Sequence, residues 1–172
     1  MLMLIADIIV ILGCGHIGMS FALRINNRIS QLEEFEKMFS LLVFDIGYMA
    51  IPINEAIMRV QSSVCGVVRS VLEQTIEFIS MYNDIPFSDA WCRAVKMENR
   101  KLFLTKEEIN TLYDFSQNVG KGDCEHAVNS IKVTIAKIKL AKENAIAEKN
   151  KNSKLYKGAG FLFGILIVLI LL

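Results

Sequence analysis

The side chains that could do chemistry in this 172-residue chain are four cysteines, two histidines and scattered acids. The cysteines are Cys14, Cys65, Cys92 and Cys124, and no two of them show the C-x-x-C spacing of metal and redox sites. Cys124 and His126 are two residues apart and cannot share a helix face, which disfavours a thiolate–imidazole pair between them. We therefore expect small, reduced cysteines and no metal site.

Motifs of catalysis are missing from the sequence as well. It contains no G-x-x-x-x-G-K-[ST] phosphate loop, no H-E-x-x-H metal helix and no G-x-S-x-G nucleophile turn. The net charge of +1 gives no reason to expect nucleic acid as a partner. We predict no catalytic residue and no cofactor, which favours a scaffold over an enzyme.

One acidic group suggests binding instead. Glu33, Glu34 and Glu36 lie opposite the apolar side of a predicted helix over residues 27–50. Such a group is either a solvated face or a surface for a basic partner, and the sequence leaves both interpretations open.

The charges are confined to the middle of the chain. All 19 Lys and Arg lie between Arg24 and Lys157, and Asp7 is the single acid outside that stretch. Residues 1–23 could cross the ~30 Å hydrocarbon core as a helix, and they lack the basic start and A-x-A-like end of a signal peptide. We predict a transmembrane helix at 1–23, a cytosolic helical domain at 24–154 and a second transmembrane helix at 155–172.

The flanking charges predict the orientation. Arg24 and Arg28 follow the first apolar segment, and four lysines precede the second: Lys149, Lys151, Lys154 and Lys157. Because basic flanks stay on the cytoplasmic side, both termini should face outward from a cell membrane that the chain crosses twice.

Small residues at four-residue spacing occur in both predicted spans and favour helix packing in lipid. They are Gly18 and Ala22, after Cys14, in the first span, and Gly160 and Gly164 in the second. Asp7 and His16 are ionisable residues of the first span, and a proton or ion path through them is the weaker interpretation.

Apolar residues three and four apart predict about six helices and no strand in the middle domain. The first ends before Pro52, and Gly66 separates the second from the third. Ser88 or Asp89 should cap the fourth, Thr105 and Glu108 form a capping box for the fifth, and Asp123 should cap a long sixth helix. The predicted fold is all-α, a compact bundle between two transmembrane helices.

Several short strings, in order and across essentially the full length, resemble the stage III sporulation protein AB family. They are Arg28, Gln31 and Leu32; Asp45-Ile46-Gly47-Tyr48 with Pro52 and Ala56; Ala90-Trp91; Glu108, Leu112, Phe115, Val119, Gly120 and Asp123; and the tail Lys154–Leu172. Arg28, Tyr48, Pro52, Trp91, Gly120 and Asp123 are expected to be structural. The family often carries a Gln where this chain has Ala127 and Val128.

The resemblance implies a function. The family is similar to the inner-membrane platform proteins of type II secretion and type IV pilus machines, and acts in a channel between mother cell and forespore. It implies a location in the mother-cell membrane around the forespore. The implied partners are a secretion-type ATPase and other membrane proteins of the channel, with a homo-oligomer left open. Glu33, Glu34 and Glu36 would then meet basic residues of the ATPase.

Two other functions compete. A membrane-tethered enzyme or sensor would use Cys124, His126 or the polar residues of the first span, and predicts a deep pocket. A coiled-coil membrane organiser would pair the last helix with its own copy. The apolar seam of that helix weakens after Ile138, which disfavours the organiser.

Overall fold

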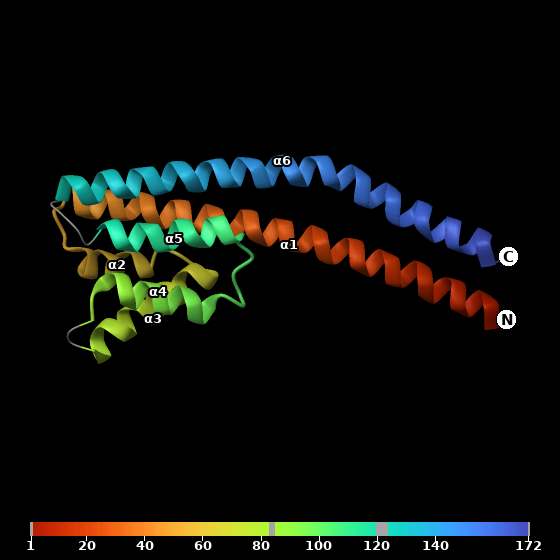
Figure 1. Cartoon of the computed structure of the whole chain (residues 1–172), viewed down its shortest axis with the longest axis horizontal. Coiled ribbons are helices and arrows are strands. Elements are labelled where there is room, and N and C mark those ends of the chain that lie inside the picture. The colour runs from red at the N-terminus through yellow and green to blue at the C-terminus, as the bar shows by residue number, and fades with distance from the viewer. Residues whose placement is uncertain (1, 83–84, 120–123, 172) are drawn as a thin grey trace. The chain divides into compact units, whose positions relative to one another are not determined.

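The computed structural model describes the backbone of residues 2–82, 85–119 and 124–171, and the side chains of residues 23–82, 85–119 and 124–151. Over these backbone ranges it contains six α-helices and no strand, which confirms the all-α class. The helices are α1 (Leu2–Gly47), α2 (Ile53–Gln61), α3 (Gly66–Met81), α4 (Phe87–Glu98), α5 (Lys106–Val119) and α6 (Cys124–Leu171) (Figure 1). The chain divides into two compact units, residues 1–27 with 144–172, and residues 28–143.

The first unit contains both predicted membrane spans, as the start of α1 and the end of α6. Apart from Leu23, the side chains of the spans 1–23 and 155–172 lie outside the described residues, as do the predicted packing residues Gly18, Ala22, Gly160 and Gly164. Among the helical residues with described side chains, none form a stretch with the length and apolarity that a membrane span requires.

The second unit is a layered helical bundle. Within it, α1 lies between α6 and α5, α4 packs on α5, and α3 packs on both α4 and α2 (Figure 1). The core is built on aromatic rings: Phe115 of α5 lies 4.7 Å from Phe39 of α1 and 5.1 Å from Trp91 of α4, measured between ring centroids. The indole N–H of Trp91 donates to the carbonyl of Leu112 at 2.8 Å, so this fully buried ring satisfies its polar atom.

The helix boundaries follow backbone preferences. Helix α1 ends at Gly47, five residues before Pro52, and Ala50 turns the chain with a φ of 51°. Gly66 adopts a φ of 61° at the start of α3, a backbone conformation that glycine adopts without strain. Both breaks were predicted from the sequence, and both are confirmed.

One predicted cap is wrong. Helix α4 begins at Phe87, so Ser88 and Asp89 lie inside its first turn, and the N-cap residue is Pro86 with no side-chain cap. Pro86 has a φ of −62° and a ψ of 145°, so its backbone is extended, and the helix begins at the next residue. Asp89 instead places a negative charge in the first turn, where it interacts favourably with the positive end of the helix dipole. Gly120 and Asp123 lie outside the described residues.

Candidate functional site

Arg28 of α1 and Glu108 of α5 form an ion pair that is nearly shielded from water. The Arg28 Nη2 lies 2.7 Å from Glu108 Oε1, and its Nε lies 3.1 and 3.3 Å from the two carboxylate oxygens. The side chains are only 16% and 5% exposed. A fork-shaped guanidinium on a carboxylate gives strong, directional hydrogen bonds, so the pair fixes the start of α5 on α1.

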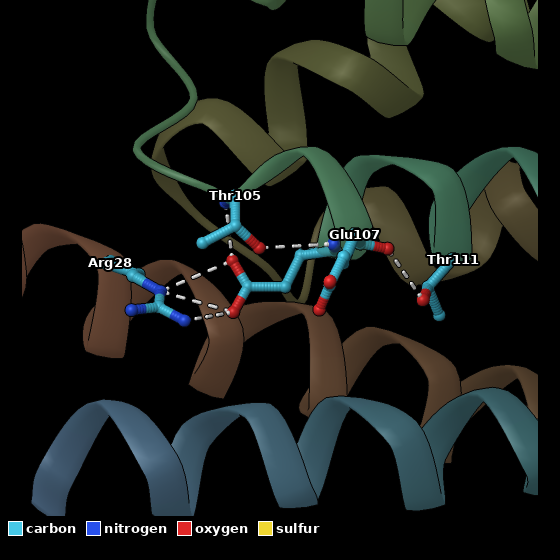
Figure 2. Close-up of polar contacts among 5 residues, drawn as sticks. Arg28, Thr105, Glu107 and Thr111 are labelled. Atoms are coloured by element: carbon cyan, nitrogen blue, oxygen red, sulfur yellow. Dashed lines mark hydrogen bonds and ion pairs between the residues drawn. The ribbon is translucent and has the colours of Figure 1, made fainter. Parts of the chain in front are cut away.

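The same carboxylate also caps its own helix. The backbone N–H of Thr105 donates to Glu108 Oε2 at 2.6 Å, and the N–H of Glu108 donates to Thr105 Oγ1 at 3.3 Å. The predicted capping box is therefore confirmed. Figure 2 shows Arg28 and Thr105 approaching this carboxylate from two sides. Glu108 thus has two partners, of which the sequence identified one.

Gln31 lies one helical turn beyond Arg28 and holds the loop between α4 and α5. Its Nε2 donates to the carbonyl of Lys101 at 2.9 Å, and its Oε1 accepts the N–H of Phe103 at 2.8 Å. Because a primary amide carries a donor and an acceptor, this one side chain satisfies two backbone groups of the loop. Arg28 and Gln31 therefore anchor both the loop and the helix that follows it.

The three predicted partner-binding acids lie in different surroundings. Glu33 is exposed to solvent, whereas Glu34 and Glu36 are partly buried. Glu34 accepts the backbone N–H of Cys65 at 3.2 Å, beside the first turn of α3. The structure thus gives Glu34 an internal partner, and Glu33 is the acid best placed for an external one.

Glu36 is held by two lysines of α6. Lys142 Nζ lies 2.6 Å from Glu36 Oε2, and Lys139 Nζ lies 3.6 Å from Oε1. The hydrogen bond to Glu36 raises the pKa of Lys142 above its usual range, although burial acts in the opposite direction. The sequence did not reveal this cluster, because 106 residues separate Lys142 from Glu36 and a lysine-rich helix looks solvated.

The far end of α1 is fastened to α2 and α6. Arg59 of α2 lies 3.4 Å from the carboxylate of the buried Asp45. The thiol of Cys124 donates to the carbonyl of Ile46 at 3.0 Å, near the end of α1. A Cβ added at Gly47 would lie 3.1 Å from Val128 of α6, so glycine permits this close approach. The Cys124 thiol is therefore engaged in the fold.

Two residues expected to be structural differ sharply in burial. Trp91 is at the centre of the core, whereas the Tyr48 side chain is 82% exposed and contacts the ring of Phe44 at 5.8 Å. Pro52 precedes α2, and its carbonyl accepts the N–H of Ala56 at 2.9 Å. Among the residues with described side chains, no group of three or more His, Cys, Asp or Glu could hold a metal ion.

The comparisons with known proteins agree with one another. A family model described as Stage III sporulation protein AB matches residues 3–172. A curated protein of that name from Bacillus subtilis (strain 168) is 23% identical over 172 residues, covering the whole of both chains. A solved structure of a stage III sporulation protein AB superposes with a TM-score of 0.67 at 18% identity, covering 73% of this chain and 98% of the other.

Proposed function

Because the chain belongs to the stage III sporulation protein AB family, we propose that it is a non-catalytic membrane platform of a sporulation-specific, secretion-like channel between mother cell and forespore. Its spans 1–23 and 155–172 anchor it in the mother-cell membrane, and its helical unit docks a secretion-type ATPase in the cytoplasm. The proposal extends the family's sporulation role to a location, a partner and a mechanism.

The observation that carries the proposal is the set of contacts made by α1 within residues 28–143. Side chains of this one helix bind α5, the α4–α5 loop, the N-cap residue of α3, α6 and α2 in turn. A load applied to any of these parts reaches α1, and α1 is also the helix that begins at Leu2 in the first predicted span. A platform that passes motor movement to a membrane needs a helix connected in this way.

The charge pattern supports an ATPase contact at Glu33. Glu34 and Glu36 already have partners inside the unit, so reversing their charge would damage the fold as well as the surface. Glu33 is exposed and one turn before Lys37, and its reversal removes none of those hydrogen bonds, although the Glu33 charge also acts on Lys142. Glu33→Lys is therefore the most direct of the three charge reversals for testing an acidic docking surface.

The experiment is co-purification of the ATPase with the full-length protein from sporulating cells. Glu33→Lys should reduce the recovered ATPase at least about tenfold, the effect of losing ~1.4 kcal/mol of binding energy. The matched control is Glu77→Lys, an exposed acid on α3, which should leave recovery unchanged. Equal recovery with both variants would refute docking through Glu33. Normal spore development after deletion of the whole protein would refute the platform role itself.

A further inference from the structure

Helix α6 carries a second surface, on the side opposite the core. Its inner face buries Ile131, Thr134 and Ile138. Its outer face exposes Val133 and Leu140, at 58% and 59%, with the exposed Ala136 between them. We call Val133, Ala136 and Leu140 the outer stripe. Its spacing of three and four residues is that of the seam through which one helix packs on another.

Lysines border the outer stripe on both sides. Lys132 and Lys139 are seven residues apart on one flank, and Lys137 lies on the other. Two of these lysines form long ion pairs within the unit: Lys137 Nζ lies 3.8 Å from Asp114, and Lys139 Nζ lies 3.6 Å from Glu36. Both lysine side chains are more than half exposed. Since Lys142 binds Glu36 at 2.6 Å, Lys139 can leave Glu36 without leaving that carboxylate unpaired.

We propose that the outer stripe binds an amphipathic helix of another protein, one whose own apolar seam is flanked by Asp and Glu. The apolar seam would pack on Val133, Ala136 and Leu140, and the acids would pair with the lysines on either flank, as charged residues beside a seam select partners in coiled coils. This inference does not depend on ATPase docking at Glu33, because it uses a different helix and the opposite charge.

Charge decides against a second copy of this chain as the occupant. In a parallel pair, the Lys132 and Lys139 flank of one copy would face the Lys137 flank of the other. In an antiparallel pair, each flank would face itself. Both arrangements place lysine opposite lysine, which repels. A lipid surface is also a poor match, since a helix lying in a bilayer interface presents a broader apolar face than two large aliphatic side chains.

The test uses two designed helical peptides and the full-length protein in neutral detergent micelles. Both peptides carry leucine along the seam, and they differ only in having Glu or Lys on the flanks. We expect fluorescence anisotropy to show at least about tenfold tighter binding of the Glu peptide. The triple variant K132E/K137E/K139E should reverse this preference, and Leu140→Asp should abolish binding of both peptides. The control K96E/K106E changes exposed lysines on α4 and α5 and should bind like the unmodified protein.

Several results would overturn the proposal. Equal binding of the two peptides, or an unchanged preference in the triple variant, would show that the lysines do not select the partner. A protein dimer that Leu140→Asp dissociates would assign the stripe to a second copy. Binding to phosphatidylglycerol vesicles that the triple variant loses, without any peptide preference, would assign the lysines to lipid. The emission spectrum of the buried Trp91 verifies folding of each variant.

Discussion

Arg28 is a residue whose loss should strongly destabilise the helical unit. Arg28→Met removes the cation from a carboxylate that is 5% exposed, so the charge of Glu108 is left buried with only the Thr105 amide as a described partner. We expect the free energy of unfolding to fall by about 3 kcal/mol, as when one member of a buried pair is removed. Urea unfolding of the full-length protein, followed by emission of its single tryptophan, measures this loss.

Two variants sharpen that measurement. Arg28→Lys should recover only part of the loss, because an ammonium cannot reproduce the forked contact with both oxygens. Arg100→Met removes an exposed arginine and should change stability by less than about 0.5 kcal/mol. If Arg28→Met costs no more than Arg100→Met, the ion pair does not hold α5 on α1.

Lys142 and Tyr113 should both contribute to the loss of stability at alkaline pH. The bond to Glu36 raises the pKa of Lys142, and burial raises the pKa of Tyr113. Both folded groups keep their protons at pH values where the unfolded groups lose them. Stability from both is therefore complete below about pH 10 and is lost as the pH rises through the folded pKa values.

We expect the urea midpoint to decrease above about pH 10, and Lys142→Met to flatten that decrease. Because Lys142 is still 24% exposed, its share should stay below about 1 kcal/mol. Lys132→Met, which removes an exposed lysine of the same helix, should leave the alkaline slope unchanged. A slope that Lys142→Met does not alter would contradict the role of the Glu36 contact.

For individual residues, the sequence predicted contacts between side chains close in the chain and missed contacts between residues far apart in it. The Thr105–Glu108 box was predictable, because both residues lie within one turn and their types fit the pattern. The partners of Glu34 and Glu36 were not, since only the packing of α3 and α6 against α1 brings Cys65 and Lys142 close. An acidic cluster that looks uniform in sequence thus consists of one exposed and two engaged side chains.

Among the elements, the loop between α4 and α5 depends on Gln31. Gln31→Ala removes the acceptor of the Phe103 N–H and the donor to the Lys101 carbonyl, whereas Gln31→Glu removes only the donor. We expect the Phe103 amide to exchange with solvent about tenfold faster in Gln31→Ala, and to stay protected in Gln31→Glu. Hydrogen exchange of the full-length protein measures both variants.

Amides of α3 provide the internal control for that experiment, because Gln31 has no described contact there. They should exchange equally in all three proteins. Faster exchange throughout the unit would mean that Gln31→Ala unfolds the domain as a whole, and the loop would not be an independent element.

Helix type was more predictable than helix extent. Periodic apolar residues identified each of the six helices of the middle domain, because a buried face repeats every three to four residues. Two of these helices continue into the terminal segments, as α1 from Leu2 and α6 to Leu171. The sequence gives no stop signal such as Pro at either junction, and the charged residues that suggested a boundary there are themselves good helix formers.

On the scale of the whole molecule, the proposed topology predicts where thiols react. Cys65 and Cys124 are exposed in the helical unit. If this unit faces the cytoplasm, a membrane-impermeant maleimide should label neither residue in intact cells and should label the protein after permeabilisation. Most of the label should be on Cys65, because the Cys124 thiol is hydrogen-bonded to the Ile46 carbonyl.

The double variant Cys65→Ser and Cys124→Ser should lose most of the labelling seen after permeabilisation. Labelling of Cys65 in intact cells would contradict the topology, and with it the proposed docking of a cytoplasmic ATPase.

Glu108 has a consequence for how this family can change over time. Its single carboxylate caps the start of α5 and pairs with Arg28. A substitution at either position therefore leaves the other charged side chain without its partner in this ion pair. Homologues that lack the arginine should also lack the acid, and an apolar pair of similar volume is the exchange that evolution can make without losing the fold. Positions 28 and 108 are therefore expected to covary, although they are 80 positions apart in the sequence.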